Sequence, residues 1–211
     1  MITVGIVSLA MGFVFLYIYQ TRIRTREDSP SALPEDVPQT DELTIENVRP
    51  GAVIHLDAVG VQSDSFDAKI TARHLHKSGS ERWTELAADR GSSTIYLTLE
   101  RDDELSISVT LTQPSVRALG KSAGVPDTDL GLLTDGRTLT YEGTTYTPLD
   151  HGHAIFCRDH NQQKPQEYEY WEFEDEDEEQ FLTLVLWEDG TVEASHSVDL
   201  NPSFITVYSQ S

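Results

Sequence analysis

The sequence predicts a mainly β protein: two small antiparallel β modules, barrel- or sandwich-like, joined by a short helical connector and preceded by one transmembrane helix. Three observations predict this arrangement. Residues 2–19 carry no charge. From Leu43 onward, apolar and polar residues alternate in short runs bounded by turn residues, a pattern typical of half-buried strands. The alternation stops once, where the spacing favours short helices. We therefore expect a transmembrane helix at 1–20, a basic flank and acidic proline-rich linker at 21–42, a first β module at 43–113, a helical connector at 114–137 and a second β module at 138–211.

The uncharged segment predicts an uncleaved membrane anchor. A helix over its 18 residues spans roughly 27 Å, which matches a hydrocarbon core about 30 Å thick. Arg22, Arg24 and Arg26 follow it and no charge precedes it, whereas a cleavable signal peptide has its basic residues first. The flanking charge predicts a single-pass protein of the inner (cell) membrane, with its N-terminus outside and its soluble domain in the cytoplasm. A reversed anchor and an atypical signal peptide are the alternatives.

The rest of the chain is strongly acidic. Residues 27–211 hold 12 Lys and Arg against 36 Asp and Glu, a net charge of −24. Nucleic-acid binding requires the opposite sign, so we expect no nucleic-acid partner. An anionic membrane leaflet would also repel the domain. Three prolines and clustered acids at 27–42 predict an extended linker between anchor and domain.

Strand patterns follow one another along both β modules. Residues 66–76 alternate strictly, and 94–100 and 104–112 read as two strands joined by a short turn. In the connector, 115–119 and 126–133 favour short helices. In the second module Asp189-Gly190, between two apolar runs, predicts a hairpin.

The two modules resemble each other. Trp83 is followed seventeen residues later by an acidic turn and a strand, and Trp171 is followed at the same distance by another acidic turn and strand. This spacing is consistent with a tandem duplication and pseudo-twofold packing. Chance alignment of two β meanders is the alternative.

Three segments carry a resemblance to a known family: 43–57 with its Pro-Gly turn, the strand at 66–70, and the aromatic strand Tyr-Glu-Tyr-Trp-Glu-Phe at 168–173. Together they resemble a bacterial family catalogued as domain of unknown function family 4178, over about 43–208. The resemblance implies no catalytic residues. It implies an association with envelope-maintenance and polyamine-related gene sets, and hence a membrane-associated housekeeping role.

Histidines are the candidate metal ligands. His74 and His76 share one strand face, as do His151 and His153 if that segment is extended, because side chains alternate along a strand. Two such pairs brought together would supply four nitrogens for zinc. Surface histidines without a metal are the simpler interpretation, and we expect no cofactor.

Acidic residues between two strands of the second module are the candidate partner-binding group. They lack the glycine and the spaced oxygen ligands of a calcium-binding loop. A solvated loop is one interpretation, and docking of a basic partner or a polyamine is the other, because dense negative charge concentrates polycations. The candidates are Glu174, Asp175, Glu176, Asp177, Glu178 and Glu179.

Two other features have structural interpretations. Cys157, the single cysteine, lies in an apolar run, which predicts a buried and inert thiol. The aromatic residues at 168–173 point to both faces of their strand. Core on both sides is one interpretation, and an exposed aromatic patch on one face is the alternative.

No nucleophile elbow, phosphate-binding glycine loop, dinucleotide fingerprint or zinc-protease helix occurs in the sequence. We therefore expect a non-enzyme: a membrane-anchored interaction or adaptor module in envelope maintenance, with an unknown protein partner. The alternative is a sensor that binds a small ligand or a cation, either a polyamine or a metal.

Overall fold

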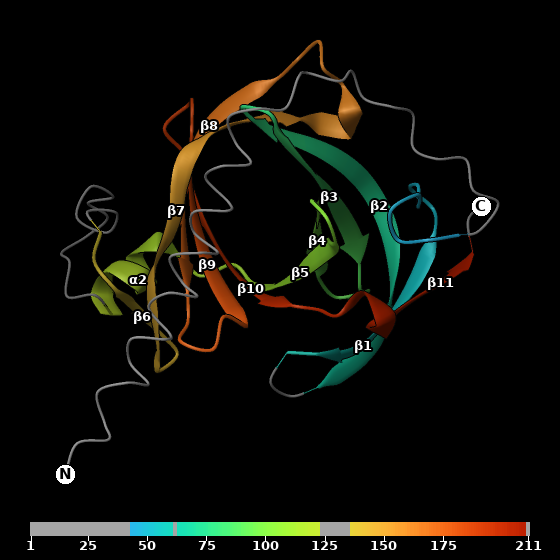
Figure 1. Ribbon diagram of the computed structural model, residues 1–211, viewed down its shortest axis with the longest axis horizontal. Helices are drawn as coiled ribbons and strands as arrows, with labels where there is room; N and C mark the ends of the chain where they lie inside the picture. The colour runs from blue at the N-terminus through green and yellow to red at the C-terminus, as the bar shows by residue number, and fades with distance from the viewer. Residues whose placement is uncertain (1–42, 61–62, 123–135, 210–211) are drawn as a thin grey trace, which may run out of the picture. The chain divides into compact units, whose positions relative to one another are not determined.

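A computed structural model describes residues 43–60, 63–122 and 136–209 of the 211-residue chain (Figure 1). This part is mainly β, as predicted, with one short α-helix and two 3-10 turns. The elements are β1 (Val53–Val59), β2 (Asp64–Ser78), β3 (Glu81–Asp89), β4 (Thr94–Arg101), β5 (Leu105–Thr112), α2 (Val116–Ser122), β6 (Leu139–Tyr141), β7 (Thr144–Cys157), η1 (Arg158–His160), β8 (Gln166–Glu174), β9 (Gln180–Trp187), β10 (Val192–Asp199), η2 (Pro202–Phe204) and β11 (Ile205–Ser209).

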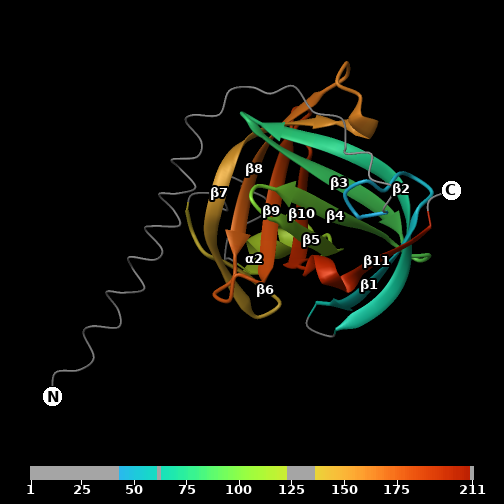
Figure 2. The ribbon, with the colours of Figure 1, turned by 45° about the vertical axis from the view of Figure 1, so that its right-hand side comes forward.

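All eleven strands of the described residues belong to one antiparallel sheet, in the order β11-β1-β2-β3-β4-β5-β10-β9-β8-β7-β6. A further pairing of β2 with β7 closes the sheet, so that eight strands form a ring from β2 to β7 (Figure 2). The length of β2 permits this closure. Its first half pairs with β1 and its last residues pair with β7 along the same edge. Both halves of the chain thus enter a single sheet.

The strand order is symmetric about two seams. The run β1 to β5 and the run β6 to β10 have the same internal neighbours, and they meet where β5 pairs with β10 and where β2 pairs with β7. The two tryptophans do not occupy equivalent positions, however: Trp83 pairs with Glu100, whereas Trp171 pairs with Leu184. The equal spacing in the sequence is therefore not the basis of the symmetry, and tandem duplication stays a prediction.

Two apolar clusters cover the outer face of the ring. Alternate residues of β3, β4 and β5, including Leu86, Leu97 and Val109, are fully buried beneath β1, β11 and residues 43–52. Alternate residues of β8, β9 and β10 are buried in the same way beneath β6 and α2. Burying each such leucine stabilises the fold by about 1.5–3 kcal/mol. The outer face thus holds most of the hydrophobic core, and the inner face is left for other chemistry.

Turn residues explain where the strands end. Gly190 has φ +84, and the Asp189 carboxylate accepts a hydrogen bond of 2.8 Å from the Thr191 amide, which confirms the hairpin predicted there. In the connector, α2 confirms the short helix expected at 115–119.

Three expectations lie outside the described residues: the transmembrane helix, the linker, and the second connector helix at 126–133. Within the described ranges, no helix has the length and apolar character needed to cross a membrane.

Candidate functional site

Contacts between strands that are not neighbours in the sheet identify the inner face of the ring. Trp83 of β3 touches the ring of Tyr170 of β8, with centroids 6.4 Å apart, although β2 and β7 lie between these strands. Phe156 of β7 touches Trp187 of β9 across β8, at 5.7 Å. Such contacts require a concave surface, so these side chains point into the ring.

Five aromatic side chains gather on this inner face, and Ala154 and Val185 complete their cluster. Gly152 makes room for one of them, because a Cβ there would lie 2.8 Å from the Tyr170 hydroxyl. The five are Trp83, Phe156, Tyr168, Tyr170 and Trp187.

His76 lies among these rings and is only 7% exposed. Its ring stacks on Trp83 at 5.4 Å with an interplanar angle of 11°, and it packs against Phe156. A hydrogen bond of 2.7 Å joins its Nδ1 to the Tyr168 hydroxyl. Its Nε2 is buried and has no hydrogen-bond partner within the described residues. In either tautomer the imidazole therefore keeps one donor or one lone pair unsatisfied.

A carboxylate stands opposite this unsatisfied nitrogen. Oε2 of Glu85 lies 3.9 Å from His76 Nε2, beyond hydrogen-bond distance. The Glu85 side chain remains 25% exposed although it points into the ring, so the interior is not completely filled. Trp83, Val185 and Trp187 are also only partly buried. Water therefore reaches Glu85 and the edges of these aromatic side chains.

The surroundings shift the pKa of each titratable group in this site. Burial, followed by the charge of Glu193, raises the pKa of Glu85 to about 7. Burial, with a smaller contribution from His74, lowers the pKa of His76 to about 3. Burial and then Glu85 raise the pKa of the Tyr168 phenol. Near neutral pH, His76 is uncharged and Glu85 is poised between its two forms.

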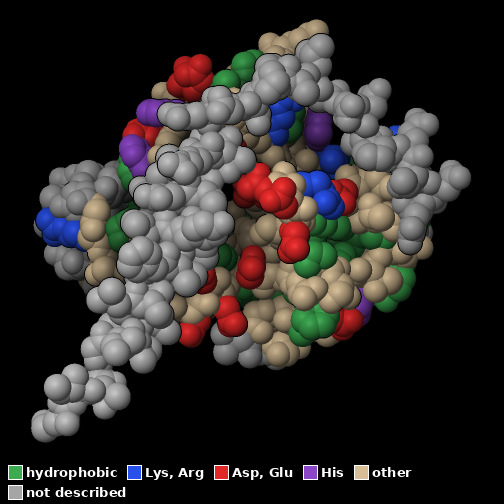
Figure 3. Space-filling model, viewed as in Figure 1, with side chains coloured by type: hydrophobic (Ala, Val, Ile, Leu, Met, Phe, Trp, Pro, Cys, Tyr) green, Lys and Arg blue, Asp and Glu red, His purple; other side chains and the backbone are tan. Residues whose placement is uncertain are grey.

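The interior thus combines aromatic faces, an unsatisfied imidazole nitrogen and the carboxylate of Glu85, which is largely shielded from bulk water. Figure 3 shows Asp and Glu side chains grouped near the middle of the face viewed there. Aromatic faces attract cations, and carboxylates in a partly enclosed site attract them more strongly than they do in water. This arrangement suits a small cation that also carries apolar groups.

The four candidate metal-binding histidines are separated by the sheet. His74 and His76 are buried, and His74 Nδ1 accepts a hydrogen bond of 3.0 Å from the Asp159 amide. His151 and His153 are exposed on the outer face, where His151 bonds Glu169 at 2.8 Å. The structure thus does not bring the two pairs together, and no group of three His, Cys, Asp or Glu side chains in the described ranges is arranged to hold a metal ion. The interpretation of all four as surface histidines is also wrong for the β2 pair, because the sheet closes over it.

The acidic candidates between β8 and β9 have unequal roles. Asp175 is 5% exposed, and its carboxylate accepts hydrogen bonds of 3.0 Å from the amides of Glu179 and Gln180 and from the Gln180 side chain. It therefore holds the loop together and is not free to bind a partner. Glu176, Asp177 and Glu178 are exposed, as is Glu179.

A separate cleft of about 560 Å³ lies where β5 meets β10, and Glu179 reaches it. Glu104 and Asp199 also line it. Burial and the charge of Glu179 raise the pKa of Asp199. Unlike the interior of the ring, this cleft has no aromatic side chain among its lining residues.

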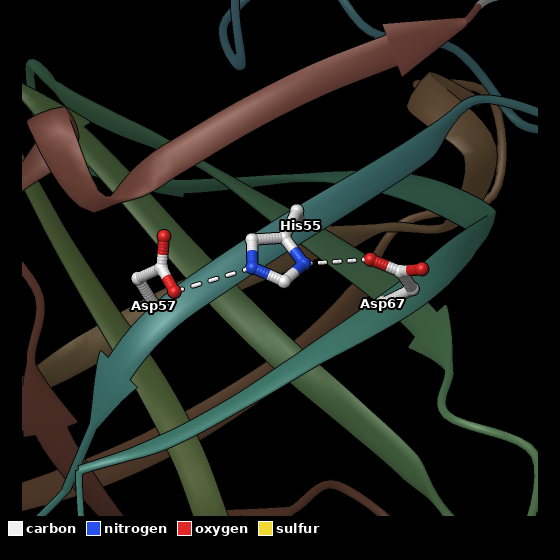
Figure 4. A network of polar contacts seen from close by, with 3 residues as sticks. All are labelled: His55, Asp57 and Asp67. Atoms are coloured by element: carbon white, nitrogen blue, oxygen red, sulfur yellow. Dashed lines mark hydrogen bonds and ion pairs between the residues drawn. The ribbon is translucent and has the colours of Figure 1, made fainter.

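His55 forms a third polar group, on β1 (Figure 4). Its Nδ1 bonds Asp67 at 2.6 Å and its Nε2 bonds Asp57 at 3.2 Å. The hydrogen bond to Asp67 raises the pKa of His55 above 6.5, against a smaller opposing effect of burial. Both ring nitrogens of His55 are hydrogen-bonded to carboxylates, so this side chain links β1 to β2. It therefore offers no free nitrogen for catalysis or metal binding.

Two other sequence expectations are confirmed. Cys157 is a buried free thiol. In β8, Tyr168 and Tyr170 face the interior while Trp171 and Phe173 pack in the outer cluster, so both faces of this strand are core.

Sequence reasoning missed Glu85 and Trp83 as site residues. The available signal was a charged residue two positions from a tryptophan, on the same strand face and directly before the apolar run at 86–88. That signal identifies a strand face that carries both a charged and an aromatic side chain. It does not show that this face lines the inside of a ring.

Fold and site together define a closed antiparallel β domain with an acidic and aromatic interior. A family model described as a domain of unknown function (DUF4178) matches residues 62–202, and the chain belongs to this family, which confirms the resemblance noted in the sequence. No curated protein and no solved structure matches the chain.

Proposed function

We propose that the domain is a binding module that takes up a small organic cation, such as a polyamine, inside its closed sheet. One observation carries the proposal: His76, buried among aromatic rings, directs an unpartnered nitrogen toward Glu85, whose side chain remains 25% exposed. Ligand pockets commonly combine apolar walls with a few convergent polar groups and perturbed pKa values.

The chemistry of the walls favours an amine over a metal ion. A bare metal requires several ligating oxygens or nitrogens, and the described residues offer no cluster of three. An alkylammonium group can instead lie over Trp83 or Trp187 and donate hydrogen bonds to Glu85. Each cation–π contact contributes about 0.5–2 kcal/mol, more where water is excluded.

Binding should release a proton. A bound cation stabilises the ionised form of Glu85, whose pKa is about 7 in the free protein. Affinity should therefore weaken as the pH falls below 7, because the ligand must then displace a proton from the carboxyl.

The sequence supports a membrane location for this module. Under this proposal residues 2–19 anchor the chain, the arginines after them keep the soluble domain in the cytoplasm, and the anchored domain acts as a sensor or adaptor in envelope maintenance. An alkaline phosphatase fused to the C-terminus tests the topology: inactive enzyme supports a cytoplasmic domain, and active enzyme contradicts it.

Calorimetric titration of spermidine into the full-length chain tests the binding proposal. We expect heat that persists in about 0.15 M salt, where the Debye length is about 8 Å and diffuse attraction is screened. Glu85→Gln should weaken binding about tenfold or more. Glu178→Gln, which removes an exposed acid of the β8–β9 loop, should leave it unchanged.

Two outcomes contradict the proposal. Heat that disappears in this salt would mean that spermidine only accumulates around an acidic surface. Equal weakening by the two substitutions would place the amine outside the ring.

A further inference from the structure

Three basic side chains lie together on the outer face of the β2–β3 hairpin. Arg73 and Lys77 lie on one face of β2, and Arg82 of β3 is the direct cross-strand partner of Lys77. His160 belongs to η1, which packs against β2. Arg158 of the same turn lies instead over the Phe156 ring, with its guanidinium carbon 5.7 Å from the ring centroid.

Arg73 has an incomplete set of partners. Its Nη1 is buried with no hydrogen-bond partner among the described residues, and its Nη2 reaches only the Thr84 hydroxyl, at 3.4 Å. Partial burial of a cation without a bonded counter-ion is unfavourable. Burial accordingly lowers the pKa of Arg73.

Among the described residues, the charge of Glu46 offsets only part of the effect of burial on the pKa of Arg73. The carboxylate of Glu46 is bound by Arg101 through two hydrogen bonds of 2.6 and 2.7 Å. Asp159 directs its carboxylate to His74, at 3.6 Å.

Like charges also face each other along the hairpin. Lys77 and Arg82 are directly opposite in the register, an arrangement that is destabilising unless something lies between the charges. Lys77 donates a hydrogen bond of 2.6 Å to the Gln162 amide oxygen, which is an uncharged acceptor. Burial, and then the charge of Arg73, lower the pKa of His160.

We propose that the outer face of the β2–β3 hairpin, beside η1, binds a small oxyanion, a phosphate or carboxylate group, with Arg73 as its principal ligand. The half-buried Arg73 guanidinium supplies the directed hydrogen bonds that an oxyanion accepts. Lys77 and Arg82 supply the surrounding positive field. The site is on the opposite face of the sheet from the interior and does not depend on the proposed cation binding.

Thermal unfolding of the full-length chain with inorganic phosphate tests this site, with sodium chloride at equal ionic strength as the reference. Phosphate should raise the melting temperature beyond the chloride reference. Arg73→Gln should weaken the apparent phosphate affinity about tenfold or more. Arg90→Gln, which removes an exposed arginine on the β3–β4 turn, should leave it unchanged.

Lys77→Gln provides a second variant that does not alter a buried group, and it should also reduce the stabilisation by phosphate.

Vesicles with and without phosphatidylglycerol distinguish the source of the oxyanion. Binding to anionic vesicles that depends on Arg73 identifies a lipid headgroup, and phosphate binding without vesicle binding identifies a free anion. Equal stabilisation by phosphate and chloride, or phosphate binding that survives both substitutions, overturns the proposal.

Discussion

Replacing Glu85 by glutamine should make the protein more stable, and increasingly so as the pH rises. The pKa of Glu85 is about 7 in the folded chain against 4.5 for the unperturbed group. Between these values the native state retains a proton that the unfolded state has lost, so stability falls with rising pH. One pKa unit corresponds to about 1.4 kcal/mol. The full difference is therefore about 3 kcal/mol, reached above pH 7 and absent well below pH 4.5. Glutamine keeps the shape of the side chain and carries no charge.

Urea unfolding of Glu85→Gln and the unsubstituted chain at pH 5 and pH 8 measures this effect. The variant should gain about 1 kcal/mol at pH 5 and about 3 kcal/mol at pH 8. His76 does not disturb the comparison, because its lowered pKa reduces the stability of both proteins as the pH falls below 6.5. Glu167→Gln, at an exposed site on β8, is the control and should show no such trend. A gain that is the same at both pH values would refute the reasoning, and so would a loss at pH 8.

Three further substitutions test the packing around the site. Tyr168→Phe removes the hydroxyl bonded to His76 and should cost about 1–3 kcal/mol in urea unfolding, because it leaves a second buried imidazole nitrogen unpaired; a variant as stable as the parent would contradict this. Gly152→Ala places a methyl group 2.8 Å from the Tyr170 hydroxyl and should cost about 1–3 kcal/mol, with a change in near-ultraviolet circular dichroism; unchanged spectra and stability would argue against the close packing. Asp175→Ala removes three hydrogen bonds from the β8–β9 loop and should speed amide exchange there while costing about 1–3 kcal/mol; unchanged exchange would show that the loop is held by other contacts.

The strands and several turns could be predicted from the sequence because alternation and turn residues are local signals. The Asp189-Gly190 hairpin is an example, and the short helix at 115–119 is another. Closure of the sheet could not be predicted in this way. It depends on pairing residues near Leu75 with residues near Cys157, and backbone pairing at such separation leaves no pattern in the side chains.

The candidate site, too, could be predicted only in its local features and not in its long-range contacts. Alternation correctly indicates that His74 and His76 share a face, as do His151 and His153. It does not indicate which face becomes the inside of a ring, so the two pairs could not be assigned to opposite environments. Glu85 acquires its raised pKa only because closure brings Glu193 and the aromatic rings around it.

The three tryptophans of the chain provide the most direct test of the proposed interior site, because two line the interior and one lies on the outer face. Two-dimensional nitrogen–proton spectra of the full-length chain give one indole signal for each, assignable by single Trp→Phe substitutions. Titration with spermidine in about 0.15 M salt should shift the signals of Trp83 and Trp187 and leave Trp171 in place. A shift confined to Trp171, or no shift at a concentration that produces calorimetric heat, would contradict cation binding inside the ring.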